Sequence, residues 1–70
     1  MSDRSFGLTK EQIDILEYLV SVKRSLRDRF SDDDIQKLLD ERFIQRDADD
    51  NNLYMISVQG DMVLRHIRYS

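Results

Sequence analysis

Apolar residues recur at helical spacing along the chain, and two of the segments with this spacing begin at residues that cap helices well. Thr9 precedes the first segment, and Gln12 stands three positions later, as in a capping box. Ser31 precedes the second segment, which opens with three aspartates that favour the positive end of a helix dipole. This pattern predicts helices over about residues 10–24 and 32–42.

The rest of the chain is expected to form a hairpin and a third helix. Residues 43–46 and 53–56 are short apolar runs typical of strands, and the polar residues 47–52 between them form a turn. Ser57 then caps a helix predicted over about residues 58–68. The expected fold is α+β, with three helices and a two-stranded antiparallel β-hairpin in the order α-α-β-β-α.

Periodicity also predicts which side chains form the core, and it marks the first helix as unusually apolar. The expected core residues are Ile13, Leu16, Val20, Ile35, Leu38, Leu39, Ile44, Ile56, Val63 and Ile67. The first helix is apolar over roughly 220° of its circumference, about twice the arc of a typical surface helix. Its second apolar stripe consists of Ile15, Tyr18, Leu19 and Val22. This stripe is a candidate interface with a partner protein or a second copy of the chain; burial of both sides by the other two helices is an equally open alternative.

Composition narrows the classes of function. The 70 residues include no cysteine and one histidine, so disulfides and a Cys/His zinc site are not expected, and we predict no cofactor. The chain lacks a signal-peptide core and any apolar run of the roughly 20 residues that span a bilayer, which predicts a cytoplasmic protein without a membrane partner. One domain over residues 8–70 is expected, preceded by a disordered tail over residues 1–7. The net charge of −3 argues against non-specific binding to nucleic acid.

Basic residues gather near the end of the first helix and again near the C-terminus. They are Lys23, Arg24, Arg27, Arg29, Arg65 and Arg68. These side chains are candidates for contacts with phosphates or with an acidic partner. We favour a purely structural role for these six basic residues, because basic residues near helix C-termini complement the helix dipole as aspartates do at N-termini.

Two short motifs resemble the second half of a winged-helix domain. Residues 39–46 read LDERFIQR, in the frame of leucine–acid–x–glycine–leucine–isoleucine–x–arginine that ends the recognition helix. Residues 54–60 read YMISVQG, in the frame of tyrosine-x-leucine-threonine-x-x-glycine, with Ser57 as the cap. The resemblance extends over residues 8–67 and implies a helix that leads into a β-hairpin wing and then into a capped helix. It also implies a function in binding DNA or protein rather than in catalysis.

Three departures from the winged-helix pattern weigh against DNA binding. Arg42 stands where the usual glycine takes a left-handed conformation, and only about ten residues separate the first helix from the helix before the wing, which indicates a reduced form. The third departure is the acidic character of the two surfaces that would approach DNA most closely. The acidic residues are Asp32, Asp33 and Asp34 at the start of the second helix and Asp47, Asp49 and Asp50 in the wing.

The acidic turn also matches half of a calcium-binding loop. Asp47, Asp49 and Asn51 have the spacing of the first three EF-hand ligands. Asn52 replaces the required glycine and Val58 replaces the bidentate glutamate, so a solvated hairpin turn is the preferred interpretation. We expect no metal site.

These observations favour a small non-catalytic protein-binding module or regulator on a reduced winged-helix scaffold. No motif marks a nucleophile, and His66 alone does not make a catalytic arrangement, so an enzyme is not expected. The predicted partner is another protein or a second copy of the chain. The alternative is a dimeric DNA-binding transcriptional regulator that uses the six basic residues, which the acidic surfaces disfavour.

Overall fold

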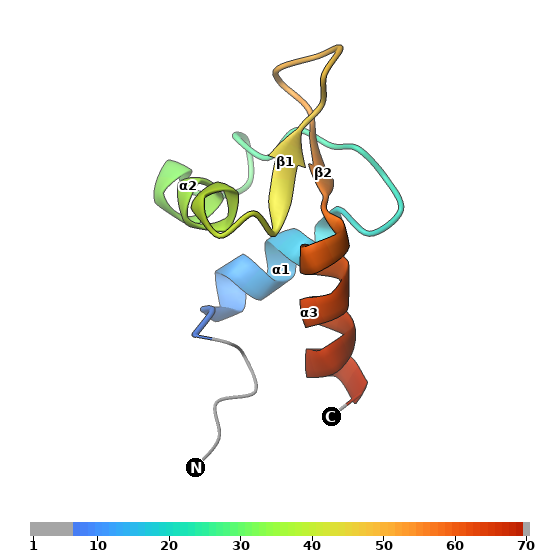
Figure 1. Ribbon diagram of the computed structural model, residues 1–70. Helices are drawn as coiled ribbons and strands as arrows, with labels where there is room; N and C mark the ends of the chain where they lie inside the picture. Colours follow the sequence, from blue (N-terminus) through green and yellow to red (C-terminus); the bar gives the residue numbers. More distant parts are fainter. Residues whose placement is uncertain (1–6, 70) are drawn as a thin grey trace.

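The computed structural model describes residues 7–69, which form three helices and one two-stranded antiparallel sheet (Figure 1). In chain order the elements are α1 (Lys10–Tyr18), α2 (Asp32–Asp40), β1 (Ile44–Arg46), β2 (Tyr54–Ile56) and α3 (Val58–Tyr69). The predicted α+β class and the order α-α-β-β-α are confirmed. Of the tail predicted over residues 1–7, only Gly7 lies within the described residues, and Ser70 lies outside them as well.

All three predicted helix starts are confirmed by their capping interactions. At α1, the Gln12 amide N–H donates to Thr9 Oγ1 over 3.2 Å, and the Thr9 N–H donates to Gln12 Oε1 over 3.0 Å. At α2, Ser31 Oγ accepts a hydrogen bond from the Asp34 N–H. Each bond satisfies a backbone donor that has no partner within its own helix. The helix starts are therefore determined by residues that are close in sequence.

The end of α1 differs from the prediction. The helix stops at Tyr18 rather than near residue 24, and Ser21 has a left-handed backbone with φ of 62°. Residues 19–31 form a loop, in which the Arg24 and Tyr54 backbones exchange two N–H···O bonds of 3.1 and 2.9 Å. Leu26, which belongs to this loop, is fully buried. Pairing with β2 and burial of Leu26 thus replace the last turns of the predicted helix.

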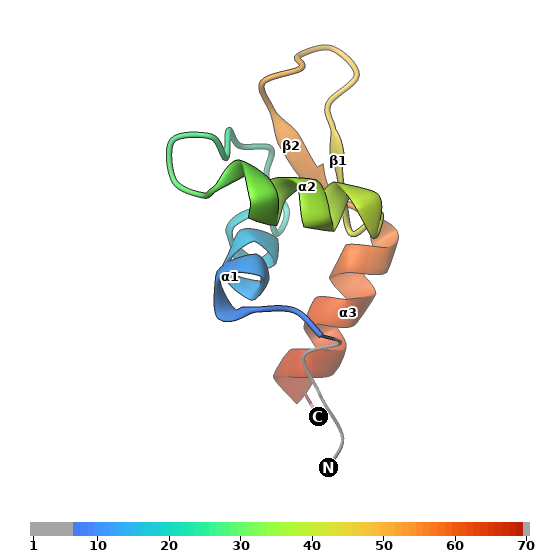
Figure 2. The ribbon, with the colours of Figure 1, turned by 90° about the vertical axis from the view of Figure 1, so that its left-hand side faces the viewer.

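The hairpin has α2 on one side and the 19–31 loop on the other. The strands pair with Ile44 opposite Ile56, Gln45 opposite Met55 and Arg46 opposite Tyr54. Figures 1 and 2 show the hairpin turn projecting at one end of the molecule and α3 extending toward the other, with α1 between them. Among residues 7–69, this arrangement leaves one long side of α3 uncovered.

The core confirms part of the predicted set and shifts the rest. Leu16, Ile35, Leu38 and Ile44 are buried as predicted. Six further residues complete the buried cluster: Leu8, Ile15, Leu19, Leu26, Tyr54 and Leu64. The other predicted core residues are only partly buried: Ile13, Val20, Leu39, Ile56, Val63 and Ile67. The shift arises because α1 packs against both α2 and α3, so Ile15 and Leu19 face the core, and because Leu26 of the 19–31 loop joins the same cluster.

A hydrogen-bonded junction joins the end of α2 to the start of α3. Arg42 has φ of 63°, so it adopts the left-handed conformation even though it is not glycine. Its carbonyl accepts a 2.6 Å hydrogen bond from Ser57 Oγ, which in turn accepts one of 3.0 Å from the Gly60 N–H. A Cβ on Gly60 would collide with the Phe43 carbonyl oxygen. Glycine is required at position 60 because the two backbones approach so closely.

Candidate interaction surfaces

The exposed side of α3 carries three large apolar side chains. Val58, Met62 and Tyr69 are 77%, 64% and 82% exposed. At 100° per residue they lie on one face of the helix, opposite the buried Gly60 and Leu64. Single exposed apolar residues are ordinary, but a group on one helix face is typical of an interaction site.

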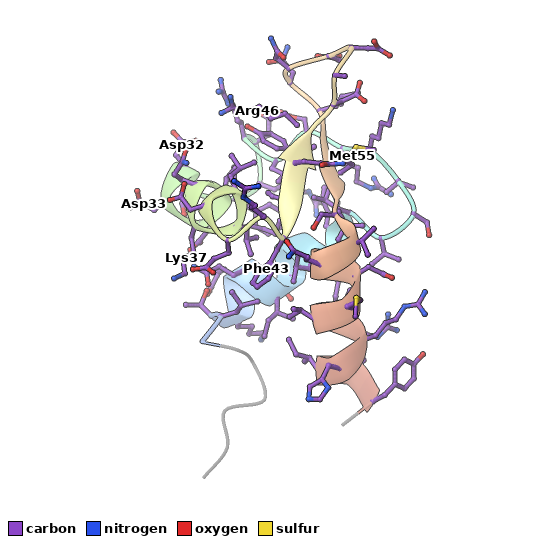
Figure 3. All side chains as sticks on the ribbon, in the orientation of Figure 1. Asp32, Asp33, Lys37, Phe43, Arg46 and Met55 are labelled. Atoms are coloured by element: carbon purple, nitrogen blue, oxygen red, sulfur yellow. The ribbon has the colours of Figure 1, made fainter. Side chains whose placement is uncertain are left out.

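A shallow apolar groove lies between the 19–23 segment and β2. It has a volume of about 220 Å³ and is lined by Leu19, Val22, Met55 and Ile56, together with the polar Ser21 and Lys23. Figure 3 shows Met55 on the side of the hairpin away from α2. The groove is large enough for one side chain of a partner and is a second, smaller apolar surface.

The second stripe of α1, predicted as an interface, is not a surface. Ile15 and Leu19 are fully buried within the chain's own core, and Tyr18 is half-buried. Val22 remains 41% exposed and lines the groove. The interpretation of this stripe as a partner or dimer interface is therefore wrong for Ile15 and Leu19, and the alternative of burial within the chain holds for them, because α2 and α3 both pack against α1.

Two arginines of the basic cluster are held by an aromatic ring. The guanidinium carbons of Arg24 and Arg29 lie 4.6 and 5.0 Å from the centroid of the Tyr18 ring. Phe30 packs edge-on against the same ring, with the centroids 5.9 Å apart. Cation–π contacts of this kind fix the orientation of a guanidinium while leaving its N–H groups exposed. Arg27 lies in the same loop and is also exposed.

The remaining predicted basic residues lie elsewhere. Lys23 pairs with Asp47, and Arg65 pairs with Asp61 within α3 at 3.0 Å. Arg65 and Arg68 line a recess of about 300 Å³ with Val20, Asp61, Leu64 and Tyr69. The six basic residues therefore divide between the loop and α3 and do not form one patch.

The ion pair between Lys23 and Asp47 ties the loop to the base of the hairpin. Lys23 Nζ lies 2.8 Å from Asp47 Oδ1, and Asp47 is 8% exposed. The Lys23 hydrogen bond lowers the pKa of the Asp47 carboxyl, and the backbone N–H groups of Asp49 and Asp50 lower it further. The same hydrogen bond raises the pKa of the Lys23 ammonium. Because each group stays charged over a wider pH range than usual, the pair holds the loop against the hairpin well to either side of neutral pH.

The six predicted acidic residues also have different environments. Asp32 and Asp33 point outward from α2, as Figure 3 shows. Asp34 is half-buried and accepts hydrogen bonds from Ser31 Oγ and Gln12 Nε2.

The acidic residues of the hairpin also divide. Asp49 and Asp50 are exposed in the turn, whereas Asp47 is buried and paired. The α2 helix and the hairpin turn are separate in Figure 1. The acidic residues therefore form two small exposed groups, as expected for the start of α2 and the hairpin turn, but Asp34 and Asp47 are drawn into the chain's own contacts and belong to neither.

Clustered metal-binding side chains and membrane-spanning helices are both absent from the described part of the chain. Among residues 7–69, no group of three or more histidine, aspartate or glutamate side chains is placed to hold a metal ion. Within the same residues, every helix is too short or too polar to cross a membrane.

Comparison of the chain with protein-family models, with curated proteins and with solved structures finds no match. The interaction surfaces are thus interpreted from their own residues.

Proposed function

We propose that this domain is a non-catalytic protein-binding module, and that the exposed face of α3 is its binding surface. The observation that supports the proposal is the exposure of Val58, Met62 and Tyr69 on one side of a 12-residue helix. Fully burying an aliphatic or methionine side chain is favourable by about 1.5–3 kcal/mol. A partner that covers this face would recover that free energy, which the folded chain alone leaves unused.

The scaffold we propose is a reduced winged helix. The Arg42 backbone takes the left-handed conformation expected at the helix end, and Ser57 caps α3 directly after the hairpin. These features agree with the two motifs that carry the resemblance. The presence of a single helix, α2, between α1 and the hairpin agrees with a reduced form.

A DNA-binding regulator is the second candidate, and one observation favours it. Arg24 and Arg29 are oriented by Tyr18, and neither pairs with a carboxylate among residues 7–69. Oriented guanidinium groups suit phosphate oxygens. The exposed Asp32 and Asp33 and the net charge of −3 oppose approach to a polyanion, so we rank this function below protein binding.

Site-specific photo-crosslinking in the source cells tests the proposed function. A benzophenone amino acid replaces Met62 on the exposed face of α3, and in a control chain it replaces the exposed Gln45 of β1. We expect protease-sensitive, nuclease-resistant adducts from position 62 and none above background from position 45. Equal crosslinking at both positions, or nuclease-sensitive adducts, would contradict the proposal.

A further inference from the structure

We infer that the α3 face binds a second copy of this chain, with the two α3 helices antiparallel about a two-fold axis. This inference rests on the proposed function and names the partner. Val58, Met62, Arg65 and Tyr69 follow each other at intervals of four, three and four residues. That is the spacing of positions along the contact line of a coiled coil. We call these four residues the α3 seam.

The α3 seam is fully available for such a contact. Its three apolar members are the most exposed large apolar residues of the described chain, and the Arg65 side chain is 72% exposed. The seam lies on the side of α3 opposite the buried Leu64, so a second helix could approach it without displacing α1.

Charge along the seam selects the direction of pairing. Parallel helices would place Arg65 against Arg65 of the second copy, and like charges in contact repel. Antiparallel helices centred between positions 63 and 64 place Met62 against Arg65 of the second copy and Val58 against its Tyr69. The cis ion pair of 3.0 Å draws the Arg65 guanidinium toward Asp61. The aliphatic stem of Arg65 is then left to cover the methionine.

The residues beside the seam complement each other in the same arrangement. Asp61 and Arg68 lie on one flank of the seam, and Gln59 and His66 lie on the other. Antiparallel coiled coils bring equivalent flanks together, so Asp61 meets Arg68 of the second copy, and two-fold symmetry repeats the pair. The surface is therefore self-complementary in charge as well as in apolar contact.

The size of the face predicts a weak dimer. A helix of 12 residues is about 18 Å long. A contact of this length falls below the roughly 1,200 Å² of buried area that stable complexes bury. We therefore expect dissociation in the range of roughly 100 µM, where the monomer and the dimer exchange quickly.

Sedimentation equilibrium of the purified chain from about 10 µM to about 1 mM tests the inference. We expect the mean mass to rise toward a dimer in the wild type and in the control Gln45→Glu, which adds a carboxylate on β1. Met62→Glu should remain monomeric, with circular dichroism showing an unchanged fold because Met62 is exposed. A wild type that stays monomeric at the highest concentration would overturn the inference.

Charge reversal tests the antiparallel direction. Arg68→Asp creates two repulsive pairs across the two-fold axis and should weaken dimerisation about tenfold. Asp61→Arg does the same and also removes the ion pair that orients Arg65, so it should weaken dimerisation at least as much. The double variant restores attraction across the axis and should dimerise more tightly than Asp61→Arg alone. A double variant that is as weak as Asp61→Arg would overturn antiparallel pairing. If the wild type stays monomeric while Met62 crosslinks a different protein in cells, the second copy is excluded and protein binding stands; without crosslinks at Met62, both fail.

Discussion

Single residues at the α2–α3 junction explain how two short helices hold a fixed position around a hairpin whose strands are three residues each. Ser57 links the Arg42 carbonyl to the Gly60 N–H through two hydrogen bonds. Because Gly60 has no Cβ, the Phe43 carbonyl can approach it closely. The one element of strain in this junction is the left-handed Arg42. A side chain in that conformation costs about 1–2 kcal/mol relative to glycine.

Replacing this strained residue should stabilise the fold. We expect Arg42→Gly to raise the free energy of unfolding by about 0.5–1 kcal/mol, because glycine adopts a positive φ without the steric cost, partly offset by its greater freedom when unfolded. The matched control is Glu41→Gly, whose backbone is right-handed with φ of −81°, and which should be destabilised. Urea titration of both variants measures the difference. The prediction is wrong if Arg42→Gly unfolds at a lower urea concentration than the wild type.

At the scale of elements, the sequence predicts where helices begin better than where they end. The capping residues Thr9 and Ser31 act on backbone groups within three positions, so they are readable in the sequence. The end of α1 depends instead on the pairing of Arg24 with Tyr54, which is distant in sequence, and on burial of Leu26 in the core. The apolar residues after Tyr18 belong to a loop that packs into the core. Their spacing in the sequence predicts a longer helix instead.

Dependence on contacts between distant segments also explains why the predicted interface on the second stripe of α1 is wrong. The wide apolar arc of α1 fits either an interface or burial on two sides, and only the packing of α2 and α3 against α1 shows that Ile15 and Leu19 are buried within the chain. The α3 seam escaped notice because α3 has apolar residues on several sides, and only the burial of Leu64 shows which side faces the core. The 4-3-4 spacing was visible in the sequence, but its orientation was not.

The 19–31 loop should behave as part of the core and not as a mobile connection. We expect Leu26→Ala to reduce the free energy of unfolding by about 2–5 kcal/mol, since it removes a fully buried leucine. The neighbouring exposed Ser25→Ala is the control and should change it by less than about 0.5 kcal/mol. Thermal unfolding followed by circular dichroism makes the comparison. Similar melting temperatures for both variants would show that the loop does not anchor the domain.

The ion pair between this loop and the hairpin makes stability depend on pH. The lowered pKa of Asp47 adds stability that is present above its unfolded value of about 3.9 and lost as pH falls through the folded value. The raised pKa of Lys23 adds stability that is present below about 10.4 and lost as pH rises through the folded value.

The stability difference between wild type and Asp47→Asn should therefore be constant from about pH 5 to pH 9 and shrink below about pH 4. Denaturant titrations at several pH values measure it. Asp49→Asn, at an exposed position of the same hairpin turn, is the control. A difference that grows as the pH falls would contradict the assigned direction of the Asp47 pKa.

At the scale of the whole molecule, charge and apolar surface are separated. Exposed aspartates lie on α2 and in the hairpin turn, the stacked arginines lie in the 19–31 loop, and the α3 seam lies along the uncovered side of α3. A chain of 70 residues buries a smaller share of its surface than larger domains do. Burying the exposed face of α3 would therefore add substantially to the stability of the fold. In our proposal, protein contact at the α3 seam provides this burial.

Concentration-dependent NMR of the uniformly labelled chain is the decisive test of contact at the α3 seam. Amide signals recorded from about 20 µM to about 1 mM should shift at Val58, Met62, Arg65 and Tyr69, while those of α2 stay constant. The same titration of Met62→Glu should show no shifts. Invariant α3 signals over the whole range, or shifts confined to α2 and the hairpin turn, would contradict the assignment of α3 as the surface through which the chain binds its second copy.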